Sequence, residues 1–319
     1  MPRGRGAALL LALALAGCAL RPPGTGAFHF GVMGDTPYNA HEEAAFVAML
    51  AAMDAHPLAF SIHVGDIKAG GKAPCTDAVY LARKAEFDRS AHPVILTPGD
   101  NDWTDCRRRS NGSMDPVERL ARLREIFFAD RWSLGRERLA TRAQSQCIAP
   151  VLPECGCAAL PENRLWIHSA VVFVTLNVPG SEDNTGHDAA NDREARCREE
   201  ANRQWLEEAA GEAEASHARG LVVALQADPW AARTPVYLPL LRHVGEVARR
   251  LDRPVLFVHG DSHTYRVDAP FVDAHGAPID NLTRLETYGS PFVGWVDVTV
   301  DPSNPELFGF QPHVQELVP

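Results

Sequence analysis

The stretch "PVILTPGDNDWTDC" (residues 93–106) decides the fold prediction for this chain. Its apolar, β-branched start predicts a buried strand, and the Pro–Gly pair that follows predicts a turn. Asp100, Asn101 and Asp102 come directly after the turn, with Asp105 close behind. Carboxylates packed this densely at the end of a buried strand repel one another. The stretch therefore calls for a neutralising positive charge.

Three other apolar runs end in the same Gly–Asp pair. Residues 28–33, 58–64 and 254–258 lead to Asp35, Asp66 and Asp261, and residues 221–225 lead to Gln226 and Asp228. In open α/β sheets ligands sit beyond the carboxyl ends of the strands, so we expect these side chains to converge with His263. A single Gly–Asp pair is also common in turns and helix caps. Four at strand ends indicate one shared site.

The same runs define the fold class. Apolar segments of strand length alternate with amphipathic helical stripes around residues 46–53, 116–127 and 241–251, and a charged helix is predicted over 199–215. Residues 164–178 predict a hairpin, and residues 179–197 predict a polar loop. Alternation of this kind predicts an α/β domain.

The converging carboxylates predict a metal centre. Oxygen donors with one imidazole suit Mn²⁺, Fe, Mg²⁺ or Ca²⁺ better than a thiolate-type zinc site. Each glycine lets the backbone approach the site closely. The predicted ligands are Asp35, Asp66, Asp100, Asp261 and His263, with either Gln226 or Asp228.

The N-terminus predicts export. Two arginines precede the apolar run "AALLLALALAG", which is short for a transmembrane helix and ends in "LAGC" at residues 15–18. This pattern is typical of a bacterial lipoprotein signal peptide over residues 1–17, with lipid attached to Cys18; the alternative is a plain secretory signal. In a Gram-negative host we expect an anchor on the periplasmic face of the outer membrane. Residues 18–27 then form a tether, and residues 28–319 form one domain.

Charge and cysteine content agree with that location. The formal net charge is −10, which disfavours nucleic acid as a partner. Besides Cys18 there are six cysteines, an even set that suggests three disulfides. We favour a Cys75–Cys106 pair, which joins two predicted neighbouring loops, with the other four pairing among themselves; an irregular cysteine-containing insertion spans about 131–163. The other four are Cys147, Cys155, Cys157 and Cys197.

At the Gly–Asp motifs the chain resembles the calcineurin-like metallophosphoesterases, as a divergent bacterial branch. The resemblance runs from residue 28 to about 300 in motif order and spacing. It implies a four-layer αββα sandwich of the metallophosphoesterase type and two divalent ions. By resemblance, Asp35 binds the first ion, Asp66 bridges both, and His263 completes the first site.

The chain departs from that pattern at several imidazole positions. Pro37 stands where the first motif has His, Asp100 replaces a ligand Asn, and Asn101 replaces the His that protonates the leaving group. Either Gln226 or Asp228 replaces a later His. Asp261 replaces the first His of the last motif. The oxygen-bearing residues that stand at the ligand positions are good ligands for hard metal ions.

The resemblance implies hydrolysis of phosphate mono- or diesters on a small phosphorylated substrate. Two cations about 3.5–4 Å apart would hold the phosphoryl group and activate a bound water. The predicted catalytic residues are Asn101, Asp102 and His259, with His63 as another substitute acid. Tyr38 and Trp103 are interpreted as packing residues, and Lys68 and Lys72 as solvated loop lysines. The alternative is a lipoprotein that binds or scaffolds without turnover.

Overall fold

The computed structural model describes residues 1, 26–144, 155, 159–231 and 235–315. They form an α/β fold with two mixed sheets, as the sequence predicts. Cys18, Cys147 and Cys157 lie outside the described residues, as does almost all of the predicted signal peptide and tether. Within the described ranges, none of the helices has the length and apolar character needed to cross a membrane.

The five-stranded sheet has the order β12-β11-β1-β2-β3. Its strands are β1 (Phe28–Met33), β2 (Leu58–His63), β3 (Val94–Leu96), β11 (Gly294–Val300) and β12 (Phe308–Val314). The first three run parallel, and β11 pairs antiparallel with both β1 and β12. Three predicted strands that end in Gly–Asp are therefore direct neighbours.

The seven-stranded sheet has the order β4-β5-β6-β7-β8-β10-β9. Its strands are β4 (Arg142–Gln144), β5 (Leu160–His168), β6 (Val171–Thr175), β7 (Gly220–Ala224), β8 (Val255–His259), β9 (Arg266–Asp268) and β10 (Leu282–Glu286). The central strands β6, β7, β8 and β10 are parallel. The antiparallel pair β5–β6 is the predicted hairpin, which is confirmed.

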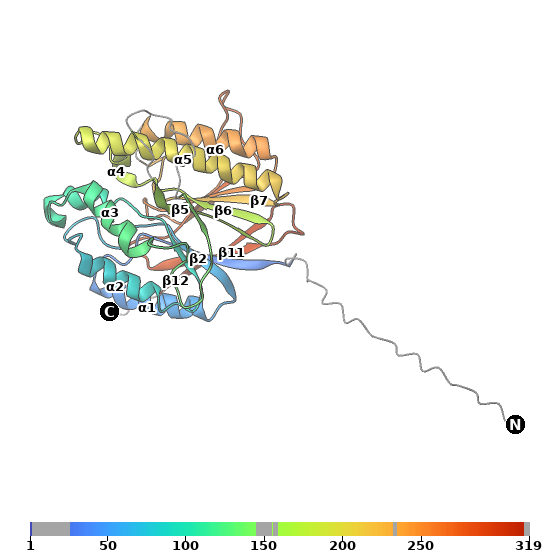
Figure 1. Cartoon of the computed structure of the whole chain (residues 1–319), viewed down its shortest axis with the longest axis horizontal. Coiled ribbons are helices and arrows are strands. Elements are labelled where there is room, and N and C mark those ends of the chain that lie inside the picture. The colour runs from blue at the N-terminus through green and yellow to red at the C-terminus, as the bar shows by residue number, and fades with distance from the viewer. Residues whose placement is uncertain (2–25, 145–154, 156–158, 232–234, 316–319) are drawn as a thin grey trace.

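The long helices cover the outer faces of the sheets, whereas the short segment α4 (Gly180–Asp183), with left-handed φ angles from Ser181 onward, lies beside the strand ends (Figure 1). The helices are α1 (Ala40–Asp54), α2 (Asp77–Phe87), α3 (Pro116–Phe127), α4, α5 (Ala189–Ala215) and α6 (Leu238–Leu251), with short 3-10 turns η1 (Thr104–Arg107), η2 (Arg109–Asn111) and η3 (Pro235–Tyr237). In Figure 1, α5 and α6 lie above the strands of the larger sheet, and α1 and α2 lie below the smaller one.

Three apolar clusters hold these parts together. One joins both sheets through aromatic side chains such as Phe30, Phe60 and Phe173. Another packs α5 and α6 on the larger sheet, and the third packs α1, α2 and α3 on the smaller sheet. Burial of this apolar surface at roughly 25 cal/mol per Å² is the main force that fixes the strand ends in place.

The prediction of a loop over residues 179–197 is wrong in its second half. α5 begins at Ala189 because Asp188 caps it, accepting hydrogen bonds from the backbone N–H groups of Ala190 and Asn191. Although the sequence of α5 is mostly polar, one face of the helix is buried. The guanidinium of Arg198 is buried and pairs with Asp183 at 2.6 Å and Glu194 at 2.8 Å.

Two disulfides lie within the described residues. Cys75 pairs with Cys106, which confirms the favoured pairing, and Cys155 pairs with Cys197. The first joins the loop after β2 to η1, and the second joins the 131–163 region to α5. Disulfides are typical of proteins that fold in an oxidising compartment, so they agree with export.

Candidate metal centre

Four carboxylates from both sheets converge beyond the strand ends. Oxygen atoms of Asp66, Asp100 and Asp261 all lie within 4.8 Å of one another. Asp35 adjoins them, since its Oδ1 accepts a hydrogen bond from the backbone N–H of Asp261 at 3.1 Å. We call these four residues the carboxylate cluster. The convergence expected from the Gly–Asp pattern is present, and it joins three strands of one sheet to β8 of the other.

The backbone is strained at the cluster. Asp35, Asp66 and Asp261 have φ angles of 54°, 59° and 74°, and His263 has a φ of 63°. The left-handed region costs a non-glycine residue roughly 1–2 kcal/mol. Such strain persists where the surrounding structure imposes it, and it concentrates at functional sites.

The glycines before the acids leave no room for a side chain. A Cβ at Gly99 would lie 2.1 Å from Asp66 Oδ1, and one at Gly260 would lie 2.0 Å from Asp35 Oδ2. The Asp66 carboxylate therefore packs directly against the backbone that carries Asp100, and the Asp35 carboxylate packs against the backbone that carries Asp261. The predicted role of these glycines in close approach is confirmed at both positions.

We expect Gly99→Ala to lower the free energy of unfolding by about 1–3 kcal/mol, because its Cβ must displace the Asp66 carboxylate. The same displacement should weaken Mn²⁺ binding. Denaturant unfolding and Mn²⁺ titration calorimetry measure the two effects. Gly211→Ala is the matched control, since nothing lies within 4 Å of its Cβ; it should bind Mn²⁺ like the parent and gain about 0.5–1 kcal/mol. Parental behaviour of Gly99→Ala in both measurements would contradict the packing argument.

Uncharged polar groups hold the carboxylates in place. Asn101 donates to Asp66 twice, from its backbone N at 3.0 Å and from Nδ2 at 2.7 Å. The hydroxyl of Tyr38 donates to Asp66 Oδ2 at 2.9 Å. Gln226 Nε2 donates to Asp261 Oδ1 at 3.0 Å, and the hydroxyl of Ser181 donates to Asp100 Oδ2 at 2.6 Å.

His263 is oriented as a metal ligand. Its Nδ1 lies 2.7 Å from the backbone carbonyl oxygen of Ser290, so Nδ1 carries the proton and Nε2 presents its lone pair. Nε2 lies 3.8 Å from Asp35 Oδ1 and 3.4 Å from the Tyr38 hydroxyl. Asp35 Oδ2 is buried and has no hydrogen-bond partner. The set of oxygen donors with one free imidazole nitrogen fits a divalent cation.

Without a cation the cluster resists ionisation. Burial, followed by the charge of Asp261, raises the pKa of Asp35 well above its usual range. Burial and the charges of Asp100 and Asp35 do the same to the pKa of Asp66. Burial and Asp100 raise the pKa of Asp261 to about 7. A bound divalent ion would remove these penalties, because it favours the charged carboxylates.

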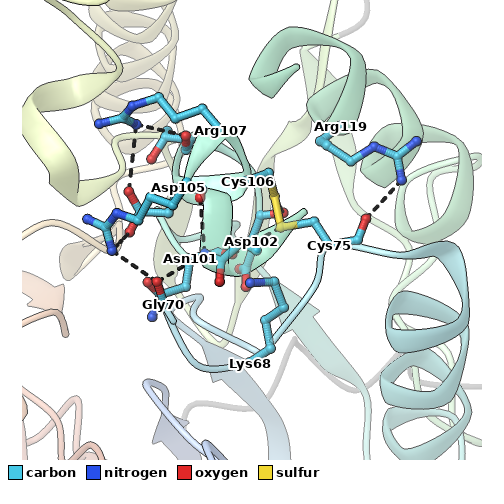
Figure 2. Close-up of a disulfide and its surroundings, with 12 residues drawn as sticks. Lys68, Gly70, Cys75, Asn101, Asp102, Asp105, Cys106, Arg107 and Arg119 are labelled. Carbon is cyan, nitrogen blue, oxygen red and sulfur yellow. Dashed lines mark hydrogen bonds and ion pairs between the residues drawn. A yellow bond between two sulfur atoms is a disulfide. The ribbon is translucent and has the colours of Figure 1, made fainter. Parts of the chain in front are cut away.

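Lys68 is a buried cation beside these acids, so its interpretation as a solvated loop lysine is wrong. Its side chain is 3% exposed, and Nζ donates to the carbonyl oxygen of Ala69 at 3.1 Å. Burial lowers the pKa of Lys68, while Asp102 and Asp66 oppose that shift. Gly70 packs against the side chain of Asn101, and the side chain of Lys68 extends beside Asp102 (Figure 2).

Asp102 has a positioning role. Its two carboxylate oxygens accept hydrogen bonds from the backbone N–H groups of Asp66, Ile67 and Gly99 at 2.8–2.9 Å. Burial raises the pKa of Asp102 to about 6, although these hydrogen bonds lower it. The carboxylate that the sequence suggested as catalytic instead ties the loop after β2 to the loop after β3.

The structure separates Asp228 and His259 from the carboxylate cluster. Of the two alternatives after β7, Gln226 points at the cluster, whereas the Asp228 carboxylate accepts from the backbone N–H of Trp230 at 2.9 Å. Asp228 and His259 instead form a second buried group with Glu286, a residue not singled out from the sequence. His63 is also buried, and it packs edge-on against Phe46 and Phe87 in the helix-facing core.

Two contributors to the site escaped the sequence analysis. Tyr38, interpreted as packing, contacts Asp66 and His263, and Asn101 Nδ2 donates to its hydroxyl at 2.9 Å. Ser181 opens a run of four left-handed residues, 181–184, directly after Gly180. A Cβ at Gly180 would lie 2.7 Å from Asp261 Oδ1. The available signal was the polar "PGSEDN" segment that follows the end of β6.

The Cys75–Cys106 disulfide links the loop after β2 to the segment after β3, which carries Asn101 and Asp102 (Figure 2). Tyr80 donates to the carbonyl oxygen of Asp102 at 2.6 Å, and Arg119 donates to that of Cys75 at 3.0 Å. Asn101 and Asp102 lie between the disulfide and the carboxylate cluster. The bond therefore fixes residues that position Asp66.

We expect the Cys75→Ala, Cys106→Ala double variant to lose about 2–4 kcal/mol of the free energy of unfolding, because the bond closes a 31-residue separation. It should also bind Mn²⁺ more weakly. The matched control is the Cys155→Ala, Cys197→Ala double variant, whose cysteines lie outside this loop. It should lose stability but keep its Mn²⁺ affinity. Equal loss of affinity in both variants would show that the effect is general destabilisation.

Comparison with known proteins gives little beyond this geometry. No known family model matches the chain, and no curated protein matches its sequence. Among solved structures, the chain is similar to GAP50, the anchor in the inner membrane complex of Plasmodium. The two share 9% sequence identity with a TM-score of 0.48, over 91% of this chain and 90% of GAP50.

Proposed function

We propose that this protein is a metal-dependent phosphoesterase of the calcineurin-like type, held at a membrane through a lipid on Cys18. The observation that carries the proposal is the carboxylate cluster with His263, built from four strand ends. The arrangement of helices outside two facing sheets supports assignment of the four-layer αββα sandwich of the metallophosphoesterase type to residues 28–319.

The residues present fit two divalent ions, such as Mn²⁺, Fe, Mg²⁺ or Ca²⁺. Asp35 and His263 would hold one ion, Asp100 and Asp261 would hold the other, and Asp66 would contribute to both. The predicted ligand Gln226 would support this set instead of binding an ion, because its Oε1 accepts from the backbone N–H of Gly180 at 2.6 Å and its Nε2 donates to Asp261. When bound, such ions stabilise the charge that develops on a phosphoryl group and lower the pKa of water. The strained backbone and the glycines keep the donors oriented before the ions arrive.

Other side chains would act on a small phosphorylated substrate directly. Asn101 Nδ2 donates to Asp66 and to the Tyr38 hydroxyl, and it would reach a phosphate oxygen by exchanging one of these hydrogen bonds. Tyr38 keeps its proton, because burial and the charge of Asp66 raise its pKa well above the usual value. A raised pKa also makes Tyr38 a weak acid, so its hydroxyl would orient Asp66 as a hydrogen-bond donor rather than protonate a leaving oxygen. Arg108, 46% exposed and paired with Asp105 at 2.5 Å, offers positive charge nearby.

The absence of an imidazole at Asn101 favours substrates with good leaving groups. General acid catalysis is typically worth about 10²–10⁴-fold, so turnover of alkyl phosphates should be slow. The same feature favours the alternative function, a lipoprotein that retains the fold and an ion and binds a partner without turnover.

The test is a metal analysis of the purified mature protein, followed by assays with aryl phosphate monoesters and diesters, with and without added Mn²⁺. The expected result is bound metal and hydrolysis that depends on it. Bound metal without turnover of either ester class would support the binding protein instead. Neither metal nor turnover would overturn the proposed function in both forms.

A further inference from the structure

A second group of metal-binding side chains lies beside the carboxylate cluster but shares no residue with it. Asp228, His259 and Glu286 each place one donor atom within 4.8 Å of the other two. They come from the loop after β7, the end of β8 and the end of β10. All three are buried, with exposures of 2%, 0% and 0%. We call them the β8–β10 group.

The imidazole of His259 is arranged as a donor to a cation. Its Nδ1 lies 2.9 Å from the backbone carbonyl oxygen of Gly260, so the proton resides on Nδ1. Its Nε2 then presents a lone pair, and this atom is buried without a hydrogen-bond partner. A backbone carbonyl on the far nitrogen is the usual support of a metal-bound histidine.

One carboxylate oxygen of Glu286 is likewise buried without a hydrogen-bond partner. Its Oε1 accepts from the Ser262 hydroxyl and from the backbone N–H of Thr264, the latter at 3.2 Å. Its Oε2 is buried and makes no hydrogen bond. Arg266 Nε lies 3.6 Å from Oε2, beyond normal hydrogen-bond distance, and its side chain is 39% exposed. The Glu286 carboxylate thus retains a free, buried lone pair.

His259 Nε2 and Glu286 Oε2 are buried acceptors without a hydrogen-bond partner beside the Asp228 carboxylate, and Arg266 at 3.6 Å does not hydrogen-bond to Glu286. A cation bound among these groups would satisfy both free atoms. One imidazole nitrogen with two carboxylate oxygens suits a first-row divalent ion such as Zn²⁺ or Mn²⁺. We propose that Asp228, His259 and Glu286 bind a further structural divalent metal ion, separate from those of the carboxylate cluster.

The position of this ion gives it a structural role. The backbone N–H of Asp228 donates to Asp261 Oδ2 at 3.1 Å, and Glu286 holds Ser262 and Thr264. The four residues follow one another in the chain as Asp261, Ser262, His263 and Thr264. An ion in the β8–β10 group therefore fixes the turn that supplies two ligands to the carboxylate cluster.

The direct test is crystallographic and uses the full mature chain without substitution. The protein is refolded with Zn²⁺ or Mn²⁺ and then crystallised. Diffraction data are collected at wavelengths on both sides of the metal's absorption edge. The expected result is an anomalous peak bounded by His259 Nε2, Glu286 and Asp228. A hydrogen bond from His259 to either carboxylate, with no anomalous peak there, would overturn the proposal.

A second test counts metal in solution by elemental analysis. Glu286→Gln keeps the side-chain shape but removes the charge, and it should lose about one equivalent of metal relative to the parent. Glu162→Gln is the matched control, since Glu162 is equally buried but pairs with Arg124. It should lose stability and keep its metal. Unchanged metal content in folded Glu286→Gln would refute the site.

The β8–β10 ion does not depend on the proposed phosphoesterase activity. Asp66→Asn should remove metal from the carboxylate cluster while the anomalous peak at His259 remains. In the unsubstituted protein, a peak at His259 without metal-dependent turnover would refute only the proposed function. Metal-dependent turnover without that peak would refute only the structural ion.

Discussion

Replacement of Asp66 by asparagine should abolish metal-dependent phosphoester hydrolysis, lowering kcat/KM by at least roughly 10³-fold. Asp66 is the carboxylate that would contribute to both proposed ions, and bound metal ions would supply several kcal/mol of transition-state stabilisation. About 4 kcal/mol corresponds to this loss of rate. The measurement is steady-state hydrolysis of an aryl phosphate at saturating Mn²⁺, combined with metal analysis.

The matched control is Asp280→Asn, which removes a charge from an exposed aspartate. It should hydrolyse the same ester at the parental rate. Because asparagine preserves the shape of Asp66, and Asn101 and Tyr38 remain to contact it, the variant should fold. Parental activity in Asp66→Asn would eliminate the carboxylate cluster as the catalytic site.

The metal-free protein should lose stability as the pH rises from about 4 to 7. Burial and the charge of Asp100 raise the pKa of folded Asp261 to about 7, against about 3.9 in an unfolded chain. Between these values the folded state binds more protons than the unfolded state. The free energy of unfolding therefore falls with rising pH, by on the order of 4 kcal/mol for Asp261 alone.

Asp35 and Asp66 add to this decline, because their pKa values are also raised well above normal. Denaturant unfolding of chelator-treated protein at several pH values measures the effect. Saturating Mn²⁺ should restore stability at pH 7, since the ion replaces the protons. Asp261→Asn should show a shallower decline without metal. A flat profile in the metal-free parent would refute the electrostatic account of the cluster.

The sequence predicts the site where local pattern determines geometry. A strand followed by Gly–Asp fixes the position of each acid at a sheet edge, and parallel neighbours bring Asp35, Asp66 and Asp100 together. The glycine contacts at Gly99 and Gly260 follow from the same pattern. The α/β class follows from the alternation of apolar runs and amphipathic stripes.

The parts that sequence could not predict depend on tertiary packing. Which of Gln226 and Asp228 faces the cluster depends on how the loop after β7 turns, and Asp228 turns back to cap the Trp230 backbone. Glu286 ends a strand without a Gly–Asp signal and approaches His259 only because β10 pairs with β8. The burial of Lys68 depends on a glycine turn that Arg108 and Asn111 hold through hydrogen bonds to the carbonyl oxygen of Gly70.

The position of the Cys75–Cys106 bond has a consequence for how the protein matures. The Cys75–Cys106 linkage and the acids share one pair of loops, so oxidation of the thiols and uptake of ions are thermodynamically coupled. Each event must favour the other by the same free energy. In a reducing cytosol the loops would lack the Cys75–Cys106 disulfide, and the ions would bind more weakly than in the oxidised protein. In the exported metalloprotein proposed above, loading of the centre would therefore follow translocation, and the bound ions would in turn protect the cystine from reductants.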